Sequence, residues 1–99
     1  MFSKHEPKQG ESTSGVATVG LTGMKADKWQ VYCIPSSGTS VVTVKVRLPK
    51  DTTPRSFIDN TISLSDPVPL IIEGNADGFV ATAATDTDEY TLVVGPLYT

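Results

Sequence analysis

The chain has 99 residues, enough for one domain with one modest hydrophobic core. Its 38% hydrophobic and 19% charged residues are typical of a chain that folds and exclude an intrinsically disordered protein. Its net charge of −3 argues against a nucleic-acid-binding protein and against a polybasic membrane anchor.

The cysteine content and the first residues bear on where the chain folds. Cys33 is the single cysteine, so no disulfide can form within the chain, and this favours a reducing compartment. The N-terminal stretch "MFSKHEPKQGESTSG" lacks the apolar core of a signal peptide. No apolar run approaches the ~20 residues that span a bilayer. We therefore expect synthesis and folding in a cytosol.

Residues 1–15 form a polar segment in which Phe2 is the one apolar anchor. Its Gly, Ser, Pro and Lys content predicts a flexible arm, followed by a single domain over residues 16–99. Two interpretations of the arm stay open at this point. It is either an end without a role, or a segment that becomes ordered against a partner.

After the arm, apolar residues recur at every second position, which is the period of a β-strand. The stretch "GVATVGLTGM" predicts a glycine-diluted strand at a sheet edge or a bulge. "KWQVYCI" is apolar on both faces, which favours a central strand. In "SVVTVKVRLP" the alternate valines and Leu48 share one face, whereas Thr43, Lys45 and Arg47 share the other.

The segment "TTPRSFIDN" is the one hint of helix, with Thr53 as a cap and Pro54 in the first turn. "TISLS" then predicts a short strand. The apolar stretches "PLIIEG", "GFVATAAT" and "EYTLVVGP" are separated by the turn-forming "GNADG" and "TDTD" and predict a three-stranded antiparallel meander. Together these elements predict an all-β fold, a small antiparallel sandwich or barrel of about seven strands.

Catalytic chemistry has few candidates in this sequence. His5 is the only histidine and lies in the arm, away from any nucleophile that it could activate. Cys33 lies inside a predicted strand, where a buried thiol behaves as a small hydrophobe. One cysteine and one histidine do not make a zinc site. We therefore expect no enzymatic activity, no catalytic residues, no cofactor and no metal.

Acidic residues in two predicted turns leave narrower alternatives open. Asp86, Asp88 and Glu89 precede the last strand, where they are either a solvated turn or oxygen ligands for calcium. Glu73 and Asp77 flank the preceding turn, and a carboxylate pair can serve a glycosidase. No aromatic-lined cleft is implied around that pair, so a turn is the favoured interpretation.

Two further features indicate surfaces for binding. Lys45 and Arg47 stand two apart on one strand and are either a solvated face or a site for an acidic partner. Trp29 and Tyr32 are three apart in a strand and therefore point to opposite faces. One is expected in the core, and the other is a candidate platform for a sugar.

The pattern "PLIIEGNADGFVATAATDTDEYTLVVGP", residues 69–96, resembles the C-terminal segment of small virion proteins of tailed bacteriophages. In those proteins a similar proline-led strand precedes a turn and a closing Tyr-x-Leu-x-Val strand. This chain has Ala-Thr-Ala-Ala where an arginine or proline is more common. The resemblance implies a structural β-sandwich, either a capsid decoration (cement) protein or a tail or fibre component, and it implies no catalytic residues.

From these features we expect a virion protein made in the host cytoplasm that bridges coat subunits of the phage head. The expected partners are the major capsid protein or other virion proteins and further copies of the chain, with a homotrimer favoured and no nucleic acid or membrane. The alternative is a carbohydrate- or receptor-binding module of a phage tail or fibre. The residues expected to contact partners are Phe2, Lys4, Lys45, Arg47, Leu97 and Tyr98.

Overall fold

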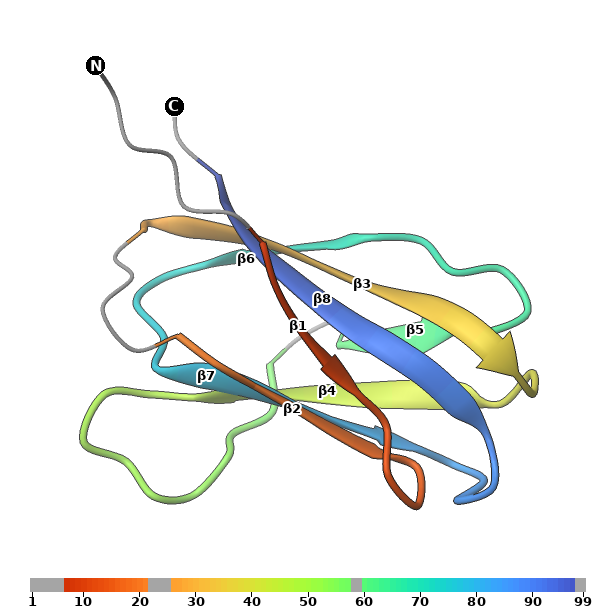
Figure 1. Cartoon of the computed structure of the whole chain (residues 1–99). Coiled ribbons are helices and arrows are strands. Elements are labelled where there is room, and N and C mark those ends of the chain that lie inside the picture. Colours follow the sequence, from red (N-terminus) through yellow and green to blue (C-terminus); the bar gives the residue numbers. More distant parts are fainter. Residues whose placement is uncertain (1–6, 22–25, 58–59, 98–99) are drawn as a thin grey trace.

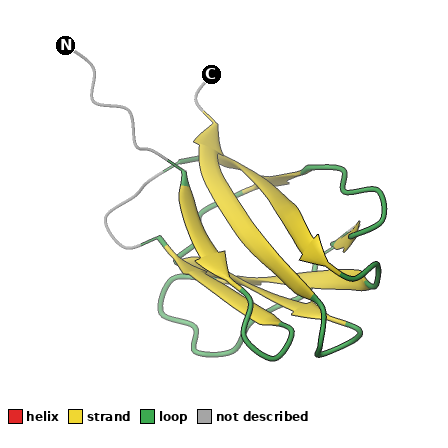
Figure 2. Ribbon diagram, turned by 45° about the vertical axis from the view of Figure 1, so that its right-hand side comes forward, coloured by secondary structure: helices red, strands yellow, loops and turns green. Residues whose placement is uncertain are grey.

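Two four-stranded antiparallel sheets pack face to face in the computed structural model, which describes residues 7–21, 26–57 and 60–97 (Figure 1). Sheet A has the strand order β1-β8-β3-β6, and sheet B has the order β2-β7-β4-β5. Figure 2 shows only strands and loops in the described ranges. The predicted all-β sandwich is confirmed, with eight strands instead of about seven. The strands are β1 (Lys8–Glu11), β2 (Val16–Gly20), β3 (Lys28–Ser37), β4 (Val41–Arg47), β5 (Thr61–Ser63), β6 (Leu70–Glu73), β7 (Gly78–Ala83) and β8 (Glu89–Leu97).

Strands from the two halves of the chain pair with each other in a nested order, in which the first strand pairs with the last and the two middle strands pair with each other. β1 pairs with β8, β2 with β7, β3 with β6, and β4 with β5. The pairings β3–β8 and β4–β7 then complete the two sheets. This is the strand order of an eight-stranded jelly roll, a double-sheet arrangement of two Greek keys.

The predicted meander of the last three strands is wrong. β6 and β8 lie in sheet A with β3 between them, whereas β7 lies in sheet B. The turns between these strands were predicted correctly, but each one crosses from one sheet to the other. Crossing lets the apolar faces of successive strands cover each other, which a flat three-stranded meander would leave exposed.

The core lies between the sheets and is built by the alternation seen in the sequence. Trp29 of β3 and Phe79 of β7 meet edge to face with ring centroids 6.3 Å apart. Leu48 was predicted on the same face as the valines of β4, but it lies beyond the strand and is 40% exposed. The predicted faces of β4 are otherwise confirmed. The buried alternate residues are Trp29, Val31 and Cys33 in β3; Val42, Val44 and Val46 in β4; Phe79, Ala81 and Ala83 in β7; and Tyr90, Leu92 and Val94 in β8.

The structure corrects the predicted arm over residues 1–15. Residues 8–11 form β1, which is hydrogen-bonded to β8 from Lys8 opposite Val94 to Glu11 opposite Thr91. β1 also packs on β2, so closely that a Cβ on Gly10 would overlap the carbonyl oxygen of Thr18. The domain therefore includes this segment, and residues 1–6 lie outside the described residues.

The predicted helix is also wrong for residues 52–57 and 60, the part of its segment that the structure describes. Arg55 forms a β-bridge with Val46: its N–H donates to Val46 O at 2.7 Å, and its carbonyl accepts from Val46 N at 2.8 Å. Pairing with the end of β4 uses the backbone groups that a helix would need. The segment is therefore a loop laid along the sheet.

Because consecutive strands run in opposite directions along the long axis of the sandwich, successive connections alternate between its two ends. The connections after β1, β3, β5 and β7 meet at one end, where Ser40 O accepts from Leu64 N at 3.0 Å and Asp88 Oδ2 accepts from Ser40 N at 2.9 Å. The connections after β2, β4 and β6 meet at the opposite end. There Asp77 N donates to Arg47 O at 2.7 Å. β1 begins and β8 ends at this second end, which we call the termini end (Figure 1).

Candidate functional site

The outer face of sheet B carries the two cations that were predicted to contact a partner. Because Val44 and Val46 point into the core, Lys45 and Arg47 point away from it. Lys45 is exposed and lies beside Val80 of β7. Arg47 is half-buried and donates weakly to the carbonyl of Asp77 at 3.4 Å. Neither side chain forms an ion pair with a residue in the described ranges, so both charges are available to a partner.

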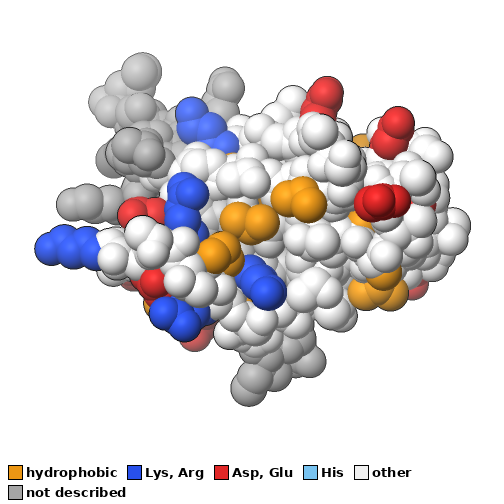
Figure 3. Space-filling model, turned by 90° about the horizontal axis from the view of Figure 1, so that it is seen from below, with side chains coloured by type: hydrophobic (Ala, Val, Ile, Leu, Met, Phe, Trp, Pro, Cys, Tyr) orange, Lys and Arg blue, Asp and Glu red, His pale blue; other side chains and the backbone are white. Residues whose placement is uncertain are grey.

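Figure 3 views this face directly and shows how its side chains are distributed. Hydrophobic side chains form a band across the face, and the Lys and Arg side chains lie at the left and near the middle of the view. Acidic side chains are the only charged ones at the right. The exposed apolar residues of these strands and of the adjoining loop are Val16 at 40%, Val41 at 44% and Leu48 at 40%.

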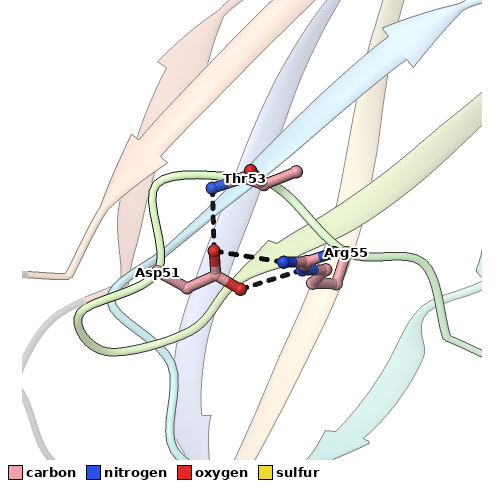
Figure 4. A network of polar contacts seen from close by, with 3 residues as sticks. All are labelled: Asp51, Thr53 and Arg55. Atoms are coloured by element: carbon pink, nitrogen blue, oxygen red, sulfur yellow. Dashed lines mark hydrogen bonds and ion pairs between the residues drawn. The ribbon is translucent and has the colours of Figure 1, made fainter.

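Arg55, next to this face, is already neutralised within its own loop. Its Nε donates to Asp51 Oδ2 at 2.8 Å, and its Nη2 lies 3.5 Å from Asp51 Oδ1 (Figure 4). The Thr53 N–H donates to Asp51 Oδ1 at 3.0 Å. The hydrogen bond from Arg55, followed by that from Thr53, holds the pKa of Asp51 below its ordinary value. The network therefore fixes the loop, while Lys45, Arg47 and the neighbouring Lys50 form no ion pair in the described residues.

The other predicted contact residues lie toward the termini end or outside the described residues. Leu97 was expected beyond the last strand, but it is the final residue of β8, half-buried and paired with Lys28. Phe2, Lys4 and Tyr98 lie outside the described residues, as does His5.

The end opposite the termini carries a cluster of acids, which we call the acidic end. Pairing of β1 with β8 brings Glu11 and Glu89 together, although they are far apart in the sequence. All cations in the described part of the chain lie in the half toward the termini end: Lys8, Lys28, Lys45, Arg47, Lys50 and Arg55. The acidic end consists of Glu11, Asp66, Asp86, Asp88 and Glu89.

A polar hollow of about 360 Å³ opens at the acidic end on the sheet A side. It lies where β1 ends, β8 begins and β3 has a bulge between Pro35 and Ser37. Its polar lining can accept hydrogen bonds and hold a positive charge, because it contains two carboxylates and four hydroxyl-bearing side chains. The lining residues are Glu11, Ser12, Ser36, Glu89, Tyr90 and Thr91.

Asp88 is part of this end, but its carboxylate is committed to the fold. It is 9% exposed and accepts from the Ser40 N–H at 2.9 Å. Hydrogen bonding by Ser40 lowers the pKa of Asp88 below its ordinary value. The calcium alternative for this turn has no support in the described residues, in which no group of three or more His, Cys, Asp or Glu could hold a metal ion.

The remaining candidates are decided by burial and pairing. Trp29 is 0% exposed and donates from Nε1 to Gly74 O at 2.9 Å, so it is a core residue and cannot be a sugar platform. Tyr32 is half-buried on the outer face of sheet A, as expected for the opposite face of the strand. Cys33 is buried, as predicted for a core residue, and burial raises its pKa to about 12. Glu73 pairs with Lys28 at 3.6 Å.

Sequence reasoning missed the acidic hollow as a site. Glu11 was assigned to the arm and Glu89 to an isolated turn, and nothing local connects them. A signal was present, however, because connections in an antiparallel sandwich alternate between ends, and none of the described cations falls in the connections after β1, β3, β5 and β7.

No protein-family model matches this chain, and the search of curated proteins gives no match either. Within the ranges that the structure describes, no helix is long and apolar enough to cross a membrane.

Proposed function

We propose that this chain is a non-enzymatic virion structural protein, a capsid decoration (cement) subunit that stabilises a phage head by bridging coat subunits. The observation that carries the proposal is the jelly-roll strand order of the two sheets. This architecture recurs in viral capsid domains and in lectins. Because one fold can host several functions, the surfaces must support the proposal as well.

The termini end offers a surface of the kind that the proposal needs. β1 and β8 are neighbours, so the chain enters and leaves the sandwich side by side at this end. Phe2, Lys4 and Tyr98 are close in sequence to these strands, and Leu97 is half-buried there. Two adjacent segments can thus contact one coat surface, and an oligomer, with a trimer favoured, multiplies such modest contacts into avidity.

The test uses phage heads purified from particles made without this chain. Fluorescently labelled chain is added, and its binding to heads is measured by cosedimentation together with the temperature at which the heads break open. We expect saturable binding and a higher breaking temperature. The absence of binding to heads would refute the proposal.

A pair of matched variants locates the contact. Leu97→Asp places a charge at the termini end, whereas Val68→Asp places the same charge on a 60% exposed residue near the opposite end. Leu97→Asp should weaken head binding and Val68→Asp should leave it unchanged. Equal effects of the two variants would count against contact through the termini end.

A carbohydrate- or receptor-binding module of a phage tail or fibre is the second candidate. The polar hollow favours it, since carboxylates and hydroxyls at Glu11, Glu89 and Ser36 are groups that can bind sugar hydroxyls. A glycan array with the purified chain tests this function, and Glu89→Gln should remove any glycan signal. Binding of the labelled chain to tails instead of heads would favour this candidate over the first.

A further inference from the structure

We propose that the basic outer face of sheet B, at Lys45 and Arg47, binds the acidic hollow between Glu11 and Glu89 on a second copy of this chain. This inference rests on the proposed function for its biological role, because the head-to-tail contact would build the oligomer that bridges coat subunits. Its physical argument comes from two surfaces of the same molecule.

The first surface is cationic and accessible. Lys45 and Arg47 project from the outer face of sheet B, opposite Val80 and Gly78 of β7. No acidic residue in the described ranges forms an ion pair with either of them. In the nearest charged loop Arg55 is held by Asp51, whereas the exposed Lys50 forms no ion pair in the described residues and adds to the positive charge. Lys45 lies opposite Val80 of β7, and apolar side chains lie next to Lys and Arg side chains on this face (Figure 3), so a partner would contact apolar area as well as charge.

The second surface is concave and anionic. The hollow of about 360 Å³ places Glu11 and Glu89 in one lining with Ser12, Ser36 and Thr91. A cationic side chain that enters it meets two carboxylates and several hydroxyl acceptors. No described cation lies at this end to neutralise them. The hollow therefore suits a lysine or arginine presented by another molecule.

The edge strands β5 and β6 are poor alternatives for contact between copies. β5 has 3 residues, and β6 follows Pro67 and Pro69, which have no N–H to donate to an added strand. Short strands and prolines discourage edge-to-edge pairing. The charged surfaces are thus better suited to self-association than these two edges.

The two surfaces differ and lie on opposite sheets, so the contact is heterologous. Each copy uses its basic face toward one neighbour and its acidic hollow toward another, which gives a ring where the rotation closes and a chain where it does not. Exposed ion pairs are individually weak and screened by salt. Association should therefore depend on concentration and on ionic strength.

The test is light scattering on the purified chain over a dilution series at about 0.1 M and about 1 M salt. We expect concentration-dependent association that weakens about tenfold at the higher salt, as two or more screened ion pairs predict. Lys45→Glu/Arg47→Glu and Glu11→Lys/Glu89→Lys should each abolish it. The chain that carries all four changes exchanges the two charges and should associate again, as should a mixture of the two double variants.

Lys8→Glu/Lys28→Glu is the matched control for Lys45→Glu/Arg47→Glu. It changes the net charge by the same amount, but at two residues of sheet A. It should associate like the parent chain. The proposal is overturned if the chain is a monomer at both salt concentrations, if the control loses association to the same extent, or if the four-fold variant is not restored. Since no heads are present, these outcomes are independent of the cosedimentation test of coat binding.

Discussion

Replacing Tyr90 with phenylalanine removes one oxygen atom from the middle of the core. The Tyr90 side chain is 2% exposed, and its hydroxyl lies 2.8 Å from Gly15 O and 3.0 Å from Ala81 O. Gly15 belongs to the turn that links β1 to β2, whereas Ala81 lies in β7. One hydroxyl of β8 in sheet A therefore ties together backbone from two segments of the opposite layer.

The expected loss in the free energy of unfolding follows from the interactions that phenylalanine keeps and those that it removes. The ring stays, so the buried apolar area changes little, but the single hydroxyl proton no longer donates to either carbonyl. A lost hydrogen bond is worth about 0.5–1.5 kcal/mol net, and a buried acceptor left without a partner adds to this. Gly15 O still accepts from Ala83 N at 2.8 Å, which limits the addition. We expect a loss of about 1–2 kcal/mol in the free energy of unfolding.

Urea and thermal denaturation measure this loss directly. For a domain of this size about 1 kcal/mol corresponds to a Tm shift of roughly 4–8 °C. The matched control is Tyr32→Phe, which removes a hydroxyl from a half-buried ring on the outer face of sheet A, and it should shift Tm by much less. Equal shifts for the two variants would refute the assignment of the Tyr90 hydroxyl as a link between the sheets.

Three further predictions concern two close contacts of glycines and the buried thiol of Cys33. Gly10→Ala should expose the β1 amides to hydrogen exchange, because the new Cβ overlaps the backbone of β2, whereas Gly20→Ala, whose Cβ meets nothing within 4 Å, should not. Gly38→Ala should lower Tm, because φ is +103° and the Cβ overlaps the Asp88 carboxylate, and the loss should be smaller in an Asp88→Ala background. Burial raises the pKa of Cys33 from 9.0 to about 12, so the unfolded chain loses the thiol proton at a lower pH than the folded chain. The free energy of unfolding should fall above about pH 9 by up to about 1.4 kcal/mol per pH unit, and Cys33→Ala should reduce the fall.

The local strand structure was largely predictable from side-chain alternation. Period two in "KWQVYCI" correctly placed Trp29 and Tyr32 on opposite faces, and in "SVVTVKVRLP" it correctly placed Lys45 outside the core, because alternation depends only on the pleat. β1 gave no such signal. "KQGE" has no apolar residue, and the segment is held by backbone pairing with β8 and by the close approach that Gly10 permits. A strand stabilised by its backbone cannot be found from hydrophobic periodicity.

Strand partners were not predictable, because turn residues report that the chain reverses but not in which sheet it continues. "GNADG" and "TDTD" were assigned correctly as turns, yet both cross between layers. The helix prediction failed for a related reason. Pro54 and its neighbours suit a helix start locally, but pairing of Arg55 with Val46 offered the backbone its hydrogen bonds elsewhere.

The separation of charge along the molecule follows from topology combined with sequence. In a sandwich whose strands all run lengthwise, the chain reverses at alternate ends, so residues in every second connection become neighbours whatever their separation in sequence. Asp66 and Asp86 fall in connections of one class, and Lys50 falls in a connection of the other. Moving an acid from the acidic end to a connection at the termini end would leave the composition and net charge unchanged. It would weaken the separation of charge between the two ends. For this reason the interaction surfaces could not be located from the net charge of −3, and the nested strand order was needed to see that one molecule carries both halves of a complementary pair.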